Sequence, residues 1–299
     1  MATMQTSNFS DLVTRGFRQI LVDEWPKLEL QYKKIINVEQ ADQLSPKESR
    51  VSPFATAVTK AETVAATEKT FAQMYDIAYT LYSYSIYYKL SRELKDNDLY
   101  DVIPKAPRML KDSHRDAMEV TVANIYNNAF TSGVGGDSKY LCASDHPLVT
   151  GTASNTVNAD LSLATLEAAM IAMRGTVDDQ NKKIKMVPRK LLVPKELGPT
   201  AHKLIKSVLD PETANNASNW VNAQQLEIIE NDYLTDVDSW FLLADKHFVK
   251  MFIGKGTTEE PELIVQATTD MTLDTIYQTY NRFGAGWTDW RGVYGAKGV

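Results

Sequence analysis

The sequence predicts an α+β fold, in which helices and strands occupy separate stretches of the chain. The longest helix is expected over Ala106–Thr131, because its apolar residues recur at helical spacing and Pro107 suits a first helical turn. Residues 82–90 alternate in character with a period of two, which is typical of a strand. The helix would span about 39 Å at 1.5 Å per residue, more than one compact core needs. We therefore expect it to support extended segments, with an ordinary long surface helix as the alternative.

The composition is that of a globular protein with a sizeable core. The chain has 299 residues, of which 43% are hydrophobic and 23% are charged. It contains no apolar run long enough to span a membrane and no secretory signal at its start, so we expect a soluble protein made in the cytosol. The single cysteine, Cys142, excludes an intrachain disulfide and every multi-cysteine metal site, and we expect it to be a small buried group.

The charge pattern does not favour a nucleic-acid-binding protein. The formal net charge is −6, and the densest basic patch, Lys182, Lys183 and Lys185, is interpreted as a solvated face. The tyrosines of residues 82–90 could form a platform on which single-stranded bases stack, but arginine and lysine are not interleaved among them. A strand within a sheet is the preferred interpretation.

The first 90 residues lack a closed core of their own. Residues 1–50 are predicted to form an arm, with a helix near Phe9–Leu21, whose apolar side is buried on the body of its own chain or on a neighbour. Residues 51–90 are predicted to form a long hairpin, with the strand at 82–90 as one side. Because an isolated two-stranded hairpin is barely stable in water, this segment implies a partner surface.

The second half of the chain alternates helices with short apolar strands. Amphipathic patterns predict helices over Leu161–Met173 and Pro199–Leu209, and a polar loop of about sixteen residues surrounds Trp220. The segments LEIIE and WFLLAD are expected to form a second sheet element, joined by a turn that contains three aspartates. The other expected strands are Leu191–Val193, FVKMFIG, ELIVQATT and a last strand from Thr275, followed by an aromatic and glycine-rich tail.

The loop after the long helix carries residue types found in active sites, but no complete site. Gly133, Gly135 and Gly136 follow a helix instead of preceding one, the reverse of a phosphate-binding loop. Cys142 and His146 are spaced as half of a metal site, and the other half is missing. Asp145 and His146 could act as an acid–base pair, yet the chain has no serine on a G-x-S-x-G elbow.

Two carboxylate clusters are similarly incomplete. Asp232, Asp236 and Asp238 could bind calcium, but they lack the spacing of a calcium loop and more often hydrogen-bond a turn. The charged connection around Arg92–Asp98 is interpreted as a solvated turn. We therefore predict no catalytic, cofactor-binding or metal-binding residues, and we keep a hydrolase using Asp145, His146 and the aspartate cluster as an alternative hypothesis.

The order of short motifs resembles that of a known family. The resemblance covers about residues 50 to 295 and rests on SREL near an acidic turn, the long helix, SDHPLVTGTASN, PRKLLVPKEL, NWVNA, WFLLAD and RFGAGWTDWRGVYG. In this order they resemble the major capsid proteins of tailed phages, and in particular the Mu-type major head protein group with the Hong Kong ninety-seven phage fold. The implied fold has an N-terminal arm, an extended β-hairpin loop, a peripheral domain with a long spine helix, and an axial domain. Laid on this chain, the resemblance implies an arm at 1–50, the extended loop and its base at 51–90, a peripheral domain at 91–158 and 262–283 with the spine helix at 106–131, and an axial domain at 159–261 and 284–299.

The resemblance implies a non-enzymatic shell protein of the virion. Copies would self-assemble into hexamers and pentamers of an icosahedral head around double-stranded DNA, with scaffolding, portal and decoration proteins as further possible partners and no membrane contact. A cellular cargo compartment of the same fold is the alternative. Lys60 and Lys69 are candidates for the hairpin lysine that some relatives use to crosslink their shell, but nothing selects an asparagine partner, so we predict no crosslink. The chain also shows no fused scaffolding segment.

Overall fold

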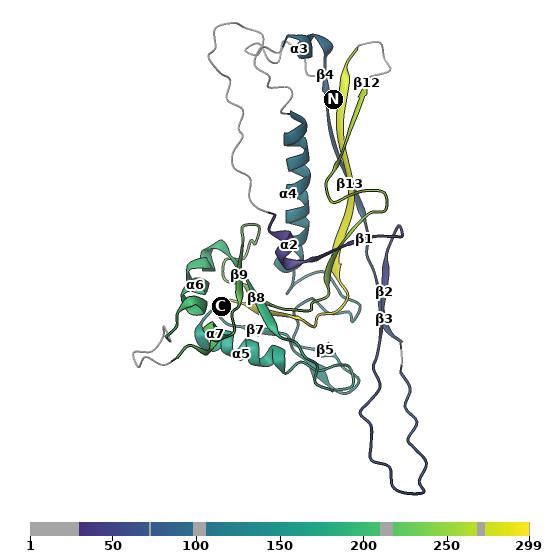
Figure 1. Cartoon of the computed structure of the whole chain (residues 1–299), viewed down its shortest axis with the longest axis vertical. Helices are drawn as coiled ribbons and strands as arrows, with labels where there is room; N and C mark the ends of the chain where they lie inside the picture. The colour runs from purple at the N-terminus through teal and green to yellow at the C-terminus, as the bar shows by residue number, and fades with distance from the viewer. Residues whose placement is uncertain (1–29, 72, 98–105, 210–217, 268–272, 299) are drawn as a thin grey trace.

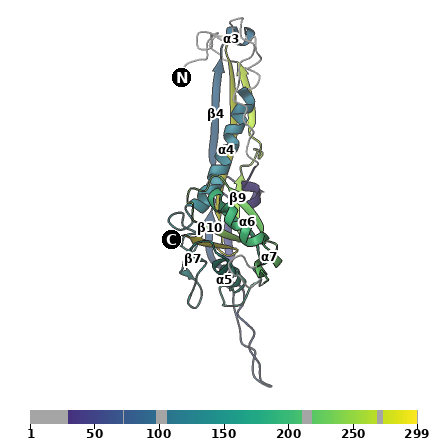
Figure 2. The same cartoon turned by 90° about the vertical axis from the view of Figure 1, so that its left-hand side faces the viewer.

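A computed structural model describes residues 30–71, 73–97, 106–209, 218–267 and 273–298 (Figure 1). Two five-stranded sheets form the body, and a thin hairpin extends away from it. The turned view shows how narrow the molecule is around its long helix (Figure 2). Within the described residues, no helix combines the length and the apolar character needed to cross a membrane.

The predicted long helix is present as α4, Ala106–Asn127. It begins where the sequence indicated and ends four residues before Thr131, in a turn that continues to the buried Ala129. Its 22 residues span about 33 Å at 1.5 Å per residue. One face of α4 packs on strand β13 (Thr275–Trp287) and on the start of the chain's described part. The apolar residues buried on this face are Leu110, Met118, Val122, Ala123, Ile125 and Tyr126.

The sheet beside α4, which we call the spine sheet, is built around β13. The first part of β13 pairs antiparallel with β12 (Glu262–Ala267) on one side and with β4 (Tyr82–Leu90) on the other. Its last part pairs with β11 (Val249–Ile253), which in turn pairs in parallel with β1 (Asn37–Gln40). Segments far apart in the sequence are thus joined by one strand of 13 residues.

The strand predicted at 82–90 is confirmed, but its predicted place in the hairpin is wrong. It pairs along its whole length with β13. The hairpin is instead formed by β2 (Lys47–Val51) and β3 (Gln73–Ala78), whose polar sequences give no strong strand signal. A period of two identifies a strand but does not identify the strand with which it pairs.

The beginning of the described chain packs on its own body. Helix α2 (Tyr32–Ile35) buries Tyr32, Ile35 and Ile36 against α4, and Ala41 is buried beside Phe252 of β11. Residues 32–41 of the predicted arm therefore pack on the body of their own chain and not on a neighbour. The helix predicted near Phe9–Leu21 lies outside the described residues.

The second sheet, which we call the axial sheet, has the order β7-β14-β10-β8-β9. LEIIE and WFLLAD are confirmed as strands β9 and β10, but β8 lies between them, because β9 pairs with β8 in parallel. The predicted glycine-rich tail is also corrected: part of it is β14, a strand in the interior of the sheet. The bounds are β7 Thr156–Asn158, β8 Pro188–Pro194, β9 Glu227–Asn231, β10 Trp240–Ala244 and β14 Val293–Lys297.

The axial sheet is buried on both faces. One face carries Leu192, Phe241 and Val293 and packs toward α4, whereas the other carries Leu191, Val193 and Trp240 and packs against three helices. Two predicted helices are confirmed with slightly different bounds, as α5 and α6. The remaining elements are α5 Leu163–Arg174, α6 Gly198–Lys206, α7 Trp220–Ala223, α3 Arg92–Asp96, the 3₁₀ turn Lys195–Leu197, and the small pair β5 His146–Pro147 and β6 Thr152–Ala153.

Candidate assembly site

His146 and Asp145, which the sequence offered as an acid–base pair, have separate partners. His146 is fully buried, with Nδ1 2.6 Å from Oδ2 of Asp137 and Nε2 3.0 Å from Oδ1 of Asn155, and its ring stacks on Trp290. Asp145 is exposed and forms an ion pair with Lys139. Both nitrogens of His146 therefore serve to hold the structure together, and the geometry offers no catalytic pair.

Asn155 is the centre of this buried polar cluster, and the sequence analysis did not single it out. Its Nδ2 atom donates to the carbonyl oxygens of Leu141 (2.8 Å) and Val293 (3.0 Å). Its Oδ1 atom accepts a hydrogen bond from the backbone N–H of Ala143 at 2.9 Å. Asn155 thus joins the loop after α4 to the start of β14.

The remaining sequence candidates also have structural partners. Cys142 is buried as predicted, and burial raises the pKa of its thiol above the usual range. Asp232 accepts a hydrogen bond from Nε2 of Gln31 at 2.6 Å, and Asp236 accepts one from the backbone N–H of Asp238 at 3.2 Å. Among the described residues, no three His, Cys, Asp or Glu side chains gather in a way that could hold a metal ion.

The base of the hairpin is fixed by a buried group of four charges, which we call the ionic anchor: Arg50, Asp179, Asp289 and Arg291. Arg50 on β2 pairs with Asp179 (Nη2–Oδ2 2.9 Å) and with Asp289, and Arg291 pairs with both carboxylates at 3.1 Å. The two positive and two negative charges balance. The anchor couples the hairpin to two distant segments of the body. Separating them would be costly, because it would leave buried charges without a partner.

Aromatic and hydroxyl groups complete the anchor around β3. Arg50 donates from Nη1 to the hydroxyl of Tyr75 at 3.0 Å and lies over its ring. Burial, followed by the charge of Asp289, raises the pKa of Tyr75 to about 12. The Tyr75 ring is also so close to Gly136 that a Cβ on this glycine would lie 2.2 Å from Cδ2 of Tyr75. Gly136, interpreted from sequence only as loop glycine, therefore makes room for the hairpin.

A second ion pair binds the hairpin base to the spine sheet. Lys250 on β11 lies 2.5 Å from Glu48 on β2 and 3.0 Å from Glu39 on β1. Burial alone would lower the pKa of Lys250, but the hydrogen bonds to Glu48 and Glu39 raise it overall. Nearby, the hydroxyls of Tyr79 and Thr288 lie 2.6 Å apart. The base of the hairpin is therefore held by contacts to the spine sheet, to the segment between β13 and β14, and to the segment between α5 and β8.

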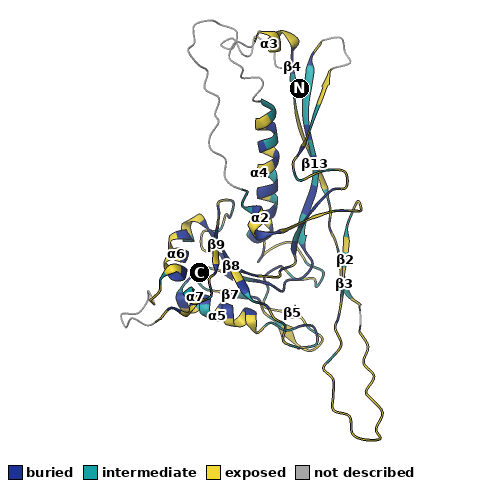
Figure 3. Cartoon of the chain, viewed as in Figure 1, coloured by how far each residue is buried: buried dark blue, intermediate teal, exposed yellow. Residues whose placement is uncertain are grey.

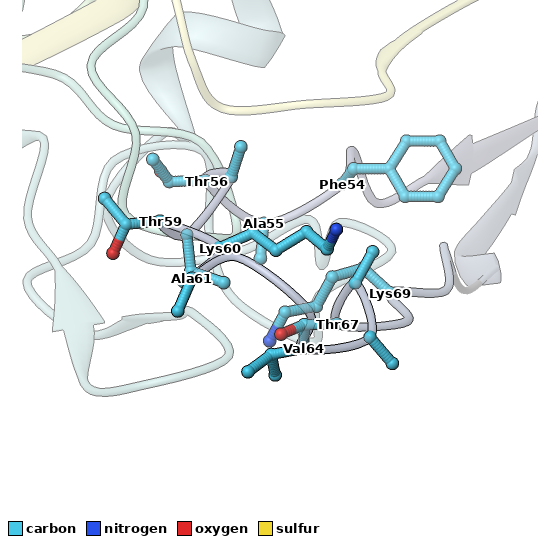
Figure 4. A pocket seen from close by; sticks show the side chains of 13 residues that line it. Phe54, Ala55, Thr56, Thr59, Lys60, Ala61, Val64, Thr67 and Lys69 are labelled. Atoms are coloured by element: carbon cyan, nitrogen blue, oxygen red, sulfur yellow. The ribbon is translucent and has the colours of Figure 1, made fainter.

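The tip of the hairpin, residues 52–71, is in contrast uncovered beyond its first residue, the buried Ser52 (Figure 3). Every residue from Thr56 to Phe71 is exposed, and the segment contains no strand. Its two sides enclose an open space of about 460 Å³, lined by small and β-branched side chains together with Lys60 and Lys69 (Figure 4). The rings of Phe54 and Phe71 meet edge to face at 5.5 Å where the sides converge.

Comparisons with solved structures identify the fold. The chain is similar to the capsid of an empty GTA particle, with 13% identity, a TM-score of 0.61 and full coverage of both chains. It is also similar to the capsid of cyanophage P-SCSP1u, with 10% identity, a TM-score of 0.66 and coverage of 97% of this chain and 94% of that one. The capsid of Helicobacter pylori bacteriophage KHP30 gives 10% identity, a TM-score of 0.59 and coverage of 100% and 98%. This is the Hong Kong ninety-seven capsid fold that the motif order predicted.

Comparisons with known sequences and families test whether the chain is related to capsid proteins as well as similar in fold. No curated protein sequence matches the chain. The phage capsid protein family matches residues 74–296, which include α4, β4 and all of the axial sheet except the last residue of β14. The Mu-type assignment within it stays a prediction. The match covers most of the chain and agrees with the shared fold, so this protein belongs to the phage capsid protein family.

Proposed function

We propose that this chain is the repeated major subunit of the head, assembled as hexamers and pentamers around packaged double-stranded DNA. Membership of the phage capsid protein family makes it a structural component of a virus shell. In this proposal the spine sheet and α4 form the peripheral domain, and the axial sheet with α5–α7 surrounds the capsomer axis. The domains proposed here differ from the limits expected from the sequence, because the spine sheet also contains β1, β4 and β11 and the axial sheet also contains β7.

The observation that carries the proposal is the contrast between the fixed base and the uncovered tip of the hairpin. The tip exposes the apolar side chains of Phe54, Val58, Val64 and Phe71. An exposed apolar surface of this kind marks an interaction site more often than the surface of an isolated protein. The ionic anchor and the Glu48–Lys250 pair hold the base, so the tip is presented in one direction. A second copy that covers the tip would bury its apolar side chains and would repeat this contact throughout a closed shell.

Assembly of the purified full-length chain tests the proposal. We expect rings or closed shells by electron microscopy, and rapidly sedimenting particles whose amount rises with protein concentration. A chain that stays monomeric at high concentration would contradict the proposal. Particles isolated from infected or expressing cells should contain double-stranded DNA, whereas a co-purifying cargo protein in its place would favour a cargo compartment.

A further inference from the structure

Helix α5 has an outer face that is unusual for a surface helix. Its residues Leu166, Ala169, Met170 and Met173 pack into the core beneath it, as expected for an amphipathic helix. Four of the five residues exposed on its outside are nevertheless also apolar: Ala164, Ala168, Ile171 and Ala172, with Arg174 as the fifth. The polar residues Thr165 and Glu167 of α5 are half-buried, so the fully exposed positions are mostly apolar, which is unusual for a surface helix. The outer face of α5 therefore indicates a surface that is covered in the assembled protein.

The end of α5 adds residue types that contribute strongly to protein interfaces. Ile171 is 65% exposed and lies one helical turn from Arg174, whose guanidinium carbon is 5.6 Å from the ring centroid of Trp220. Nη2 of Arg174 also donates to Oε1 of Gln224 at 2.5 Å, so the side chain is held in place over the indole. Trp and Arg are enriched among residues that dominate binding energy. We call the residues Ala164, Ala168, Ile171, Ala172, Arg174 and Trp220 the α5 face.

A surface of complementary character lies on the opposite side of the axial sheet. The turn Asp236–Val237–Asp238 places a valine that is 46% exposed between two carboxylates. The same loop is fixed to α4, because Leu234 packs into the core shared with α4 and Oδ1 of Asn127 accepts from the N–H of Thr235 at 3.0 Å. Figure 1 shows α4 and α5 on opposite sides of the axial sheet, so the loop that is fixed to α4 and the helix that carries the α5 face are separated by the sheet.

We propose that the α5 face of one copy binds the Asp236–Val237–Asp238 turn of a second copy of this chain. The proposal rests on the proposed function, since it names the surfaces that would join neighbours in a capsomer. Val237 would contact Ile171 and the alanines, which are small enough for a backbone to approach closely, and Arg174 would face the carboxylates. The two surfaces differ, so the contact runs head to tail and closes into a ring when repeated about an axis.

Exchange of charges across this contact provides the test. Arg174→Asp and Asp238→Arg each place like charges opposite one another, so each should raise the protein concentration needed for rings or shells about tenfold or more, whereas the double variant should restore assembly toward the wild-type concentration. Asp238 is a better position for the substitution than Asp236, because the Asp236 side chain also accepts a hydrogen bond from the N–H of Asp238 within the turn. Thermal unfolding of dilute subunits should be the same for all three variants.

A second pair of variants tests the apolar part. Ile171→Asp should block assembly, and Val149→Asp is the control because Val149 is similarly exposed but lies outside α5, in the loop between β5 and β6. Normal assembly of I171D or of both single charge variants would overturn the inference while leaving the proposed function intact. Single variants that fail without rescue by the R174D/D238R double variant would show that the α5 face binds another part of the neighbour. A wild-type chain that forms no particles would instead overturn the proposed function itself.

Discussion

Nη2 of Arg50 lies 2.9 Å from Oδ2 of Asp179 and joins the base of the hairpin to the segment between α5 and β8. We predict that Arg50→Met destabilises the subunit by about 3 kcal/mol, because it leaves two buried carboxylates with only Arg291 as a partner. The free energy of unfolding from urea titrations checks this value. Arg92→Met is the matched control, since Arg92 forms an exposed pair with Asp96 and its loss should change stability by less than about 0.5 kcal/mol.

The same Arg50→Met variant should also loosen the hairpin. Limited proteolysis should cut it within residues 52–71 faster than it cuts the wild type, while cutting elsewhere should change less. Equal rates in the two proteins would show that the ionic anchor does not set the order of the hairpin.

The apolar face of α4 gives a sharper test of folding. Ile125 is 7% exposed and lies in the core between the two sheets, so Ile125→Asp buries an unpaired carboxylate and should cost about 4 kcal/mol or more. We expect insoluble protein or loss of the cooperative unfolding transition. Val120→Asp on the same helix is the control, because Val120 is 44% exposed and its substitution should leave the subunit folded.

Deletion of Ala57–Thr67 separates folding from assembly. These residues are exposed and lie beyond the paired strands β2 and β3, so their loss should leave the thermal unfolding of the subunit unchanged. We expect the deletion to prevent shell closure, as seen by electron microscopy. Intact shells from the shortened chain would contradict the role proposed for the hairpin tip.

Glu119 predicts a specific dependence of stability on pH. Its carboxylate accepts hydrogen bonds from the backbone N–H groups of Gln31 (2.7 Å) and Tyr32 (3.0 Å), but burial dominates and raises its pKa from 4.5 to about 7. The folded chain therefore holds this proton more tightly than the unfolded chain does. The free energy of unfolding should fall by on the order of 2 kcal/mol as the pH rises from about 4.5 to about 7, and should then level off.

The Glu119→Gln variant isolates this effect. The amide cannot ionise, so the difference between wild type and E119Q should change with pH only within that window. Denaturant unfolding at about pH 5, pH 7 and pH 8 checks it, with subunits kept too dilute to assemble. A difference that stays constant across the three values would show that Glu119 does not titrate there.

The sequence predicted where helices and strands occur better than it predicted which strands pair with each other. The start of α4 and the strand at 82–90 were correct because each is encoded by a periodic pattern within its own residues. The partner of that strand was wrong, because β13 begins at Thr275 and no local signal connects the two. Strand β2 was missed because its half-buried residues, Glu48 and Arg50, are charged. Strand β3 was missed because its half-buried residues Met74, Tyr75 and Ile77 do not alternate strictly with exposed ones.

The same reason limits what could be predicted about sites. Arg50, Asp179 and Asp289 are separated by more than a hundred residues in sequence, and each alone is an ordinary surface charge until the fold brings them together. Asp236 was predicted correctly as a residue that hydrogen-bonds its own turn, because its partner, the N–H of Asp238, is local. Asp232 instead accepts from Gln31, which is distant in the sequence. The outer face of α5 was visible as alanine-rich sequence, but only the positions of the core helices and sheet show which alanines remain outside.

The interior position of β14 has a consequence for synthesis. Residues 293–297 lie between β7 and β10, so the axial sheet stays incomplete until these residues have left the ribosome. A prematurely terminated product lacks this strand and exposes the backbone edges of both neighbours. We expect such a fragment to be excluded from a growing particle, so the order of the strands would select for chains that contain β14.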